Sequence, residues 1–546
     1  LLACPSLENQ LIPLPPQIFS DRKNSYSINL DVESEAHPFE TLIQAQMTTY
    51  WQGGPIVNNT RDYESMIKKH DSELHVISSP YDRTNDVGSL VWSSQEQVSN
   101  ALDIAHDYFP IWQQTPVTER ADYLEALADK LEANMPELVA LCHKEAGKTI
   151  HDSIDEVREA VDFCRYYAVQ AKLNFTTPET IVGFDDVSHQ IARQGRGVFV
   201  CISPWNFPLA IFLGQVTAAL VAGNTVIAKP AEQTSLIAVR AMEMLLETGI
   251  ASQAVHLLPG DGKTVGAPLT SDHRVAGVAF TGSTETAQLI NRTLANRTVK
   301  GIGVAPVPFI AETGGQNAMI VDSTALPEQV VRDVMRSAFA SAGQRCSALR
   351  VLFVQQDIAD RIINLIKGAM AELNVGLPEL HCTDVGPVID LKAKEKLLAH
   401  IEKMTLEGKL IAQAELPDCS VKGDFVPPSA FEIDSINQLE NEQFGPVLHI
   451  VRFKANEIDK VVSEINSTGF GLTVGIHSRN QVTYTRIEKN IKVGNCYVNR
   501  DQVGAVVGVQ PFGGQGLSGT GPKAGGPRYL FRYTQAQQIS STIGSK

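Results

Sequence analysis

GVFVCIS (residues 197–203) is the stretch that decides the fold, because a short β-branched run between glycine and small polar residues is typical of a buried strand. Three similar runs follow it: NTVIAKP (224–230), AVHLLPG (254–260) and VAGVAFTGS (275–283). Helix-like connectors separate some of them, at residues 235–249 and 284–295. Strands that alternate with helices of this length predict an α/β fold with a doubly wound parallel sheet.

A second alternation begins near Thr313 and predicts a second α/β unit. It starts with the run FIAETGGQNAMIV (309–321), and a helical pattern follows at residues 328–343. The next strand-like and helix-like runs are residues 348–355 and 360–373. Upstream, Ser94 and Gln97 have the spacing of a capping box, which opens a predicted helical region reaching to about Ala171.

Composition excludes several classes of protein. A chain of 546 residues predicts two or three domains. The formal net charge of −15 disfavours binding to nucleic acid or to anionic lipid. The uncharged run at residues 208–228 contains AGN, a helix stop before a β-branched strand, so we predict a buried helix and strand and no membrane span.

The eight cysteines form no C-x-x-C motif and no Cys/His cluster. This pattern predicts a cytoplasmic protein without a metal site or a disulfide framework. Except for Cys346, we expect each cysteine to be a small buried apolar residue.

Polar or small clusters follow the predicted strands at ISPWNFP (202–208), KPAEQT (229–234), PGDGKTVG (259–266) and FTGST (280–284). Since the carboxyl ends of parallel strands meet at one edge of a sheet, we expect a dinucleotide to lie there. The glycines alone are a weak signal, because ordinary turns also use them. The carboxylate of Glu232 can accept from ribose hydroxyls and would repel a 2′-phosphate, which favours NAD over NADP.

Cys346 lies in ASAGQRCSALR (340–350), among small residues and two arginines. By itself a cysteine is more often buried and structural, whereas a nucleophile needs a partly exposed, electropositive setting. Glu312, in AETGG (311–315), can act as a general base if it is partly desolvated at the mouth of a cleft. The two residues together indicate covalent catalysis.

These motifs occur, with EQFGPV (442–447), in an order and spacing that resembles the aldehyde dehydrogenase superfamily from about His75 to Thr534. ETGG has Thr313 where most of the superfamily has leucine. The segment at residues 499–527, NRDQVGAVVGVQPFGGQGLSGTGPKAGGP, resembles the glutamate-semialdehyde (1-pyrroline-5-carboxylate) dehydrogenase branch. Within that branch the chain is most similar to the C-terminal half of bifunctional proline-utilisation proteins. Leu1 in place of methionine is consistent with an excised half.

The resemblance implies a catalytic role for three residues. Cys346 would attack the aldehyde carbon, and the resulting oxyanion would be held by the Asn206 side-chain amide and the Cys346 backbone N–H. A hydride would then pass to NAD. Glu312 would activate water to hydrolyse the thioester, which gives a free acid.

The resemblance also assigns the binding residues. The cofactor set is Ile202, Ser203, Pro204, Trp205, Lys229, Glu232, Gly262, Gly266, Thr281, Gly282, Ser283, Thr313, Gly314, Glu442 and Phe444. The substrate set is Glu159, Phe207, Arg345, Ser347, Gly504, Ala505 and Phe512. Glu159 matches the position that meets the substrate amine, but Glu156 lies three residues away and stays an alternative.

The family implies an aldehyde dehydrogenase-like architecture with a Rossmann-type NAD domain, an α/β catalytic domain and a β-rich oligomerisation arm. The expected boundaries are a lead-in or linker at 1–74, the NAD domain at 75–179 and 198–312, the catalytic domain at 313–498, and the arm and tail at 180–197 and 499–546. A homodimer is expected, with a fused proline dehydrogenase half in a longer protein. The alternatives are a dehydrogenase for another semialdehyde, such as succinate semialdehyde, and a catalytically silent scaffold.

Overall fold

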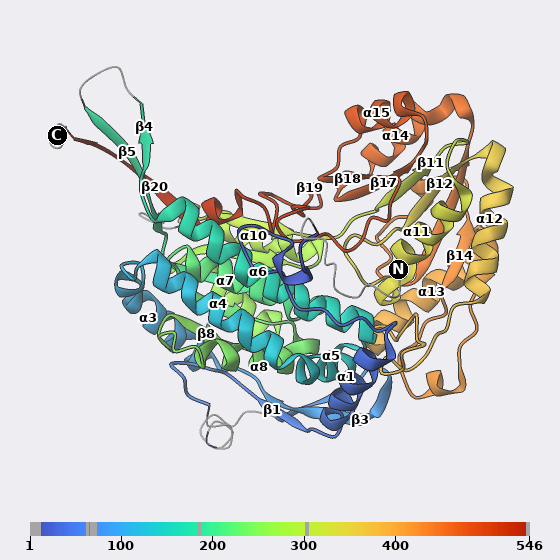
Figure 1. The fold of residues 1–546 in the computed structure, drawn as a ribbon. Helices are drawn as coiled ribbons and strands as arrows, with labels where there is room; N and C mark the ends of the chain where they lie inside the picture. Colours follow the sequence, from blue (N-terminus) through green and yellow to red (C-terminus); the bar gives the residue numbers. More distant parts are fainter. Residues whose placement is uncertain (1–11, 62–64, 66–73, 183–186, 301–304, 542–546) are drawn as a thin grey trace, which may run out of the picture.

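The computed structural model describes residues 12–61, 65, 74–182, 187–300 and 305–541 (Figure 1). Parts of the predicted lead-in (1–11, 62–64 and 66–73), of the arm (183–186) and of the tail (542–546) lie outside the described residues. The domain boundaries drawn from the sequence stay a prediction.

A five-stranded parallel sheet forms the first half of the molecule, and all the strand-like runs at 197–283 belong to it. Its order is β10-β9-β6-β7-β8, so β6 lies at the centre. Ile202 and Lys229, the last residues of β6 and β7, lie side by side in register, as expected for a shared carboxyl edge. The strands are β6 (Val198–Ile202), β7 (Thr225–Lys229), β8 (Val255–Leu257), β9 (Val275–Thr281) and β10 (Phe309–Glu312).

Helices cover this sheet, and the predicted capping box is confirmed: the Ser94 side chain accepts from the Gln97 amide at the start of α3. The long α6 packs against both α4 and α7. The uncharged run at 208–228 folds as α7 followed by β7. The helices are α3 (Gln95–Trp112), α4 (Val117–Ala133), α5 (Met135–Ala146), α6 (Ile150–Phe175), α7 (Ala210–Val221), α8 (Ser235–Leu246), α9 (Ala267–Ser271) and α10 (Thr284–Lys300).

A seven-stranded sheet forms the second half, in the order β13-β14-β15-β12-β11-β17-β18. Only the pair β13 and β14 is antiparallel. Its strands are β11 (Ala318–Val321), β12 (Val351–Gln355), β13 (Lys409–Gln413), β14 (Ser429–Glu432), β15 (Val447–Phe453), β17 (Thr473–His477) and β18 (Asn495–Val498). Its helices are α11 (Pro327–Phe339), α12 (Gln356–Ala371), α13 (Leu391–Glu407), α14 (Ile458–Ser467) and α15 (Gln481–Asn490), and a short pair, β16 (Phe470–Gly471) and β19 (Gln515–Gly516), adjoins it.

The chain passes from one sheet to the other within a few residues. Glu312 ends β10 in the first sheet, and Ala318 opens β11 in the second. The predicted base therefore lies where the two sheets meet.

Three antiparallel strands form an arm that projects from the body at the upper left of Figure 1. They are β4 (Glu179–Ile181), β5 (Ser188–Gly195) and β20 (Thr534–Ser541). Most described residues at 180–197 therefore lie in β-strands, as do residues 534–541 of the predicted tail.

The described part of the lead-in contains regular structure that weak periodicity did not reveal. Helix α1 (Glu33–Gln46), which includes Pro38, packs against α5, and β1 (Trp51–Gly53) pairs with β3 (Asp82–Val91). A strand of three residues is too short to show a period of two. Strand β2 (Leu74–Ser79) completes this small sheet.

The prediction for the cysteines was only partly correct. Cys142, Cys164 and Cys201 are buried as expected, whereas Cys419 is half-buried and Cys382 and Cys496 are exposed. Cys4 lies outside the described residues. Both exposed residues lie outside the hydrophobic clusters. Cys382 lies in an irregular segment, and Cys496 lies on the exposed face of β18, between the buried Asn495 and Tyr497. No described helix combines the length and apolarity needed to cross a membrane.

Glu156, on α6, supports the start of a neighbouring helix. Its Oε1 accepts from the backbone amides of Leu209 and Ala210 at 2.9 and 2.8 Å, where α7 begins. Its Oε2 lies 3.3 Å from Lys148 Nζ, and both side chains are buried. A carboxylate at a helix N-terminus satisfies amides that have no partner within the helix.

We therefore predict that Glu156→Ala lowers the free energy of unfolding by about 3 kcal/mol, because it leaves the buried Lys148 ammonium without its carboxylate. Urea unfolding followed by fluorescence measures the change. Asp155→Ala is the matched control. The carboxylate of Asp155 is half exposed, and its Oδ1 lies 3.9 Å from Nη1 of Arg158, so it forms only a weak ion pair. An equal loss in both variants would contradict the assigned role.

Candidate active site

Cys346 occupies a tight turn between α11 and β12. The Ala348 amide donates to the Arg345 carbonyl at 3.0 Å, which makes Cys346 and Ser347 the two central residues of a β-turn. Cys346 is partly exposed. We call residues 345–348 the nucleophile turn.

Small residues permit the backbone path into this turn. The sequence predicted a helix through residue 343, but α11 ends at Phe339. Ser341, Ala342 and Gly343 then adopt left-handed conformations, with φ of 54°, 53° and 67°. A Cβ on Gly343 would also collide with the backbone oxygen of Gly445. Larger side chains would be strained at these positions.

Buried amide side chains hold the carbonyl groups of the nucleophile turn. Asn317 Nδ2 donates to the carbonyls of Cys346 and Ala348 at 2.6 and 3.0 Å. Gln502 Nε2 donates to the Ser347 carbonyl at 3.1 Å. Our sequence analysis missed both residues, because a single polar residue at a strand or loop end carries no local signal.

One cavity of about 100 Å³ brings Cys346 and Glu312 together with every residue of the predicted substrate set. Thr281 and Thr313, which were assigned to the cofactor set, also line it. The predicted substrate residues in its wall are Glu159, Phe207, Arg345, Ser347, Gly504, Ala505 and Phe512.

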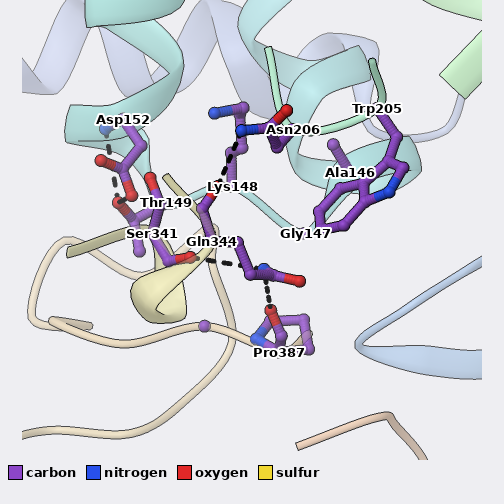
Figure 2. A pocket seen from close by; sticks show the side chains of 11 residues that line it. Ala146, Gly147, Lys148, Thr149, Asp152, Trp205, Asn206, Ser341, Gln344 and Pro387 are labelled. Carbon is purple, nitrogen blue, oxygen red and sulfur yellow. Dashed lines mark hydrogen bonds between the residues drawn. The ribbon is translucent and has the colours of Figure 1, made fainter. Parts of the chain in front are cut away.

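Asn206 lies beside a second, smaller cavity, shown in Figure 2. Its Nδ2 donates to the Gln344 carbonyl at 3.0 Å, and so it contacts the backbone just before the nucleophile turn. The amide nitrogen carries a second hydrogen that this bond does not use. Trp205 lines the same cavity, and its ring meets Phe444 edge to face at 5.5 Å.

The cavity that contains Cys346 and Glu312 is also lined by residues that the sequence analysis missed, although their helical spacing could have revealed them. Phe163 and Tyr167 follow Glu159 at intervals of four on α6, and both line the cavity. Ile211 and Gln215 are likewise four apart on α7. Residues four apart share one face of a helix, so the position of Glu159 predicts these neighbours.

Glu159 and Glu156 are separated clearly by their surroundings. Glu159 lines the cavity, and burial raises its pKa to about 8, with a further contribution from the charge of Glu156. Glu156 is fully buried beneath α7 and is bonded to the helix and to Lys148. Of the two alternatives, only Glu159 faces the cavity.

The surroundings of Cys346 are not electropositive, contrary to what we expected for a nucleophilic cysteine. Arg345 pairs with Asp152 at 2.5 Å, and Arg350 pairs with Glu442 at 3.1 Å, so both guanidinium charges are compensated. Burial raises the pKa of the Cys346 thiol to about 12, and the charges of Glu442, Glu312 and Glu159 add to the effect. The sequence shows the arginines but not their partners, which lie far away along the chain.

Glu312 is desolvated, as predicted for a general base. Its Oε2 accepts from the Gly514 amide at 2.9 Å, while its Oε1 is buried without a hydrogen-bond partner in the described part of the chain. Burial raises the pKa of this carboxyl group to about 8, although the Gly514 amide and Lys523 oppose the shift. Gly513 and Gly519 approach the carboxylate where a Cβ would crowd it.

The predicted cofactor residues lie along the carboxyl edge of the first sheet. Ser203 Oγ is buried without a partner among the described residues, and Lys229, also buried, donates to the Pro230 carbonyl at 3.2 Å. Glu232 accepts from the Gly262 amide at 3.1 Å, and the space beside Gly262 is open. Buried hydroxyl and ammonium donors next to open space fit a ligand that carries hydroxyl and phosphate groups.

Other members of the cofactor set extend this edge. Ser283 Oγ accepts from the Thr286 amide at 3.2 Å and thereby caps α10. Gly314 approaches Glu442 so closely that a Cβ would collide with the carboxylate. Of the remaining members, Ile202 ends β6, Pro204 lies two residues beyond it, and Gly282 directly follows β9. Gly266 ends the helical turn Gly262–Gly266, which follows β8. Among the described residues, no group of three or more His, Cys, Asp or Glu side chains is suited to hold a metal ion.

The chain belongs to the aldehyde dehydrogenase family, whose family model matches residues 67–539. Among curated relatives, the bifunctional protein PutA of Klebsiella aerogenes is 48% identical over 96% of this chain, and the match covers 39% of that protein's length. The 1-pyrroline-5-carboxylate dehydrogenase of Geobacillus kaustophilus (strain HTA426) is 36% identical over 88% of this chain and 93% of its own.

Solved structures agree with this assignment. A crystal structure of bifunctional proline utilization A (PutA) aligns with a TM-score of 0.86 and 45% identity over 98% of this chain and 50% of its own. A 1-pyrroline-5-carboxylate dehydrogenase from Thermus with bound NAD aligns with a TM-score of 0.89 and 30% identity over 95% of this chain and 99% of its own. The chain thus spans only part of its bifunctional relatives.

The raised pKa of Cys346 predicts how the thiol reacts with iodoacetamide when no ligand is bound. Alkylation requires the thiolate, so its rate on Cys346 should rise with each pH unit from 7 to 10 without a plateau. In Glu312→Gln, Cys346 should be alkylated several-fold faster than in the wild type above pH 8, because the substitution removes a negative charge beside the sulfur.

Peptide mass spectrometry separates Cys346 from the other cysteines, and the exposed Cys382 in the same digest verifies that the reagent is active. An alkylation rate of Cys346 that reaches a plateau near pH 8 would contradict a thiol that is buried among carboxylates.

Proposed function

We propose that this protein oxidises L-glutamate γ-semialdehyde, the open form of 1-pyrroline-5-carboxylate, to L-glutamate with NAD in proline catabolism. The observation that carries the proposal is the single cavity in which Cys346, Glu312 and the whole substrate set meet. The names of the relatives, which include several 1-pyrroline-5-carboxylate dehydrogenases, support it.

The cavity matches the substrate in charge and shape. The small residues Gly504 and Ala505, with Ser347, leave backbone amides and a hydroxyl accessible to a carboxylate. Glu159 offers a carboxylate to the substrate amine, and ionisation of this group is favoured once a cation lies beside it. Phe207 and Phe512 flank the aliphatic stem.

Cys346 Sγ, as the thiolate, bonds to the aldehyde carbon, while the π electrons of the carbonyl group pass to its oxygen, which becomes an oxyanion. The Cys346 backbone N–H and the second hydrogen of Asn206 Nδ2 donate to that oxygen. NAD⁺, when bound, supplies the hydride acceptor, and its cationic ring favours the ionised thiol. In the thioester that results, a water molecule attacks the carbonyl carbon while Glu312 accepts a proton from it, and the C–S bond breaks to release the acid.

The cofactor set along the sheet edge would hold NAD. Lys229 and Ser203 contribute donors, and Glu232 binds ribose hydroxyls and disfavours a 2′-phosphate. Glu442 and Phe444 would contact the nicotinamide ribose. The domain boundaries given above, with the NAD domain at 75–179 and 198–312 and the catalytic domain at 313–498, are part of this proposal.

The assembly follows the family pattern. The arm formed by β4, β5 and β20 would contribute to a homodimer, because its projecting strands offer edges for a second copy. Since the chain covers 39% of its PutA relative, a proline dehydrogenase half would precede it in a longer cytoplasmic protein.

The proposal predicts that kcat/KM for glutamate semialdehyde is more than tenfold higher than for succinate semialdehyde and aliphatic aldehydes. It predicts the same preference for NAD over NADP. A tenfold preference corresponds to about 1.4 kcal/mol of selective transition-state binding. NADH formation across the panel measures it. Cys346→Ala should abolish turnover while NAD still binds, whereas Cys382→Ala, which changes an exposed cysteine, should remain active. Equal rates for glutamate and succinate semialdehydes would reject the specific substrate.

A further inference from the structure

Arg350 ends the loop that carries the nucleophile, and its guanidinium bonds to several parts of the site at once. The side chain is 1% exposed. Its Nη1 donates to the carbonyls of Gly343 and Gly445 at 2.6 and 3.3 Å. Its Nη2 donates to the Arg345 carbonyl and to Glu442 Oε1, both at 3.1 Å.

We propose that Arg350 is a positioning residue that orients the backbone amide of Cys346 toward the substrate and couples this orientation to Glu442. The inference rests on the proposed function, since it gives that amide a part in stabilising the oxyanion.

Peptide geometry carries the first step. The Arg345 carbonyl and the Cys346 N–H belong to one planar trans peptide group, so they point in opposite directions. The carbonyl accepts from both Arg350 Nη2 and the Ala348 amide, which fixes its direction. The Cys346 N–H therefore points away from the Arg350 guanidinium. In this proposal it faces the substrate cavity, which Cys346 lines.

The second step links this amide to the expected cofactor contacts. Arg350 holds Glu442 by an ion pair, and its Cζ lies 5.1 Å from the centre of the Phe444 ring. Phe444 in turn packs edge to face against Trp205. A single rigid guanidinium thus bonds to the nucleophile turn and to Glu442, and it packs beside the Phe444 ring. Glu442 and Phe444 are the two residues proposed to meet the nicotinamide ribose.

Arginine is required for this arrangement because its planar fork presents several donors in fixed directions. A lysine at the same position keeps the positive charge, but its three N–H groups radiate from one nitrogen. They cannot replace the fork that serves three carbonyls and a carboxylate. Arg350→Lys therefore changes geometry while it preserves charge.

The backbone of Arg350 is anchored independently of its side chain. Its amide donates to the Asn317 carbonyl, and its own carbonyl accepts from the His449 amide and His449 Nδ1, each at 3.0 Å. A change of side chain should therefore leave β12 in place, which makes the substitution informative.

Steady-state kinetics of Arg350→Lys test the inference. We expect kcat at saturating NAD and glutamate semialdehyde to fall by about tenfold to 100-fold, as for a misplaced catalytic group, with a smaller change in KM for the aldehyde. Arg165→Lys is the matched control, since Arg165 is equally buried and pairs with Glu132 and Asp129 away from the site. Its kcat should match the wild type even if its melting temperature falls.

Two further measurements separate the possible outcomes. The double variant Arg350→Met/Glu442→Gln removes both charges and is compared with Glu442→Gln alone, since Glu442 is itself a proposed cofactor contact. The double variant should have a lower kcat than Glu442→Gln if Arg350 orients the turn, and should recover to at least the kcat of Glu442→Gln if only charge balance matters. Without NAD, Arg350→Lys should shift the alkylation of Cys346 to higher pH, because Glu442 is then less well compensated; Arg165→Lys should not.

A wild-type kcat in Arg350→Lys, an equal loss in Arg165→Lys, or recovery in the double variant would overturn the inference. Failure of the proposed function is distinct, because the wild-type enzyme would then form no NADH from any aldehyde of the panel. The alkylation profiles would in that case still test the placement of Arg350.

Discussion

The site depends on one physical constraint: three buried carboxylates surround the Cys346 thiol and disfavour its ionisation. Glu312, Glu159 and Glu442 all raise the pKa of Cys346, and the nearby arginines are already paired. The thiol and the Glu312 carboxyl are therefore mostly protonated at neutral pH when no ligand is bound. A substrate amine and a cationic cofactor ring would bring the positive charge that the cavity lacks, so reactivity would depend on their binding.

The two sheets explain how distant parts of the chain reach this cavity. Glu312 ends the first sheet, and a few residues later the second sheet begins. The nucleophile turn precedes β12 in the second sheet, while Glu159 and Phe207 come from the first half. Each half alone supplies an incomplete set, which places the chemistry at the junction.

Much of the fold could be predicted from the sequence. The β-branched runs that became β6 to β9 are separated by connectors of helical length, and the uncharged run at 208–228 contains its own helix stop. Local patterns failed where structure is short or irregular. Strand β1 has three residues, and the left-handed conformations of Ser341 and Ala342 end α11 earlier than its periodicity suggests.

The candidate site could be predicted as a set of residues but not as an electrostatic environment. Motifs identified Cys346, Glu312 and Glu159, which the structure brings to one cavity. The carboxylates that compensate Arg345 and Arg350 are 193 and 92 positions away in the sequence. Asn317 and Gln502, which hold the nucleophile turn, are likewise not marked by any local sequence pattern. Burial is the main cause of the raised pKa of the thiol, and the long-range pairs compensate the arginine charges that would otherwise oppose it. Both become visible only when the chain is folded.

The central claim is that Cys346 carries the acyl group that Glu312 helps to hydrolyse. Glu312→Gln enzyme, mixed with NAD and glutamate semialdehyde and then quenched in acid, tests it by peptide mass spectrometry. The account predicts that the acyl adduct accumulates on the peptide containing Cys346, with one NADH formed per active site. NADH formed at the full wild-type turnover, or an adduct on another cysteine, would contradict it.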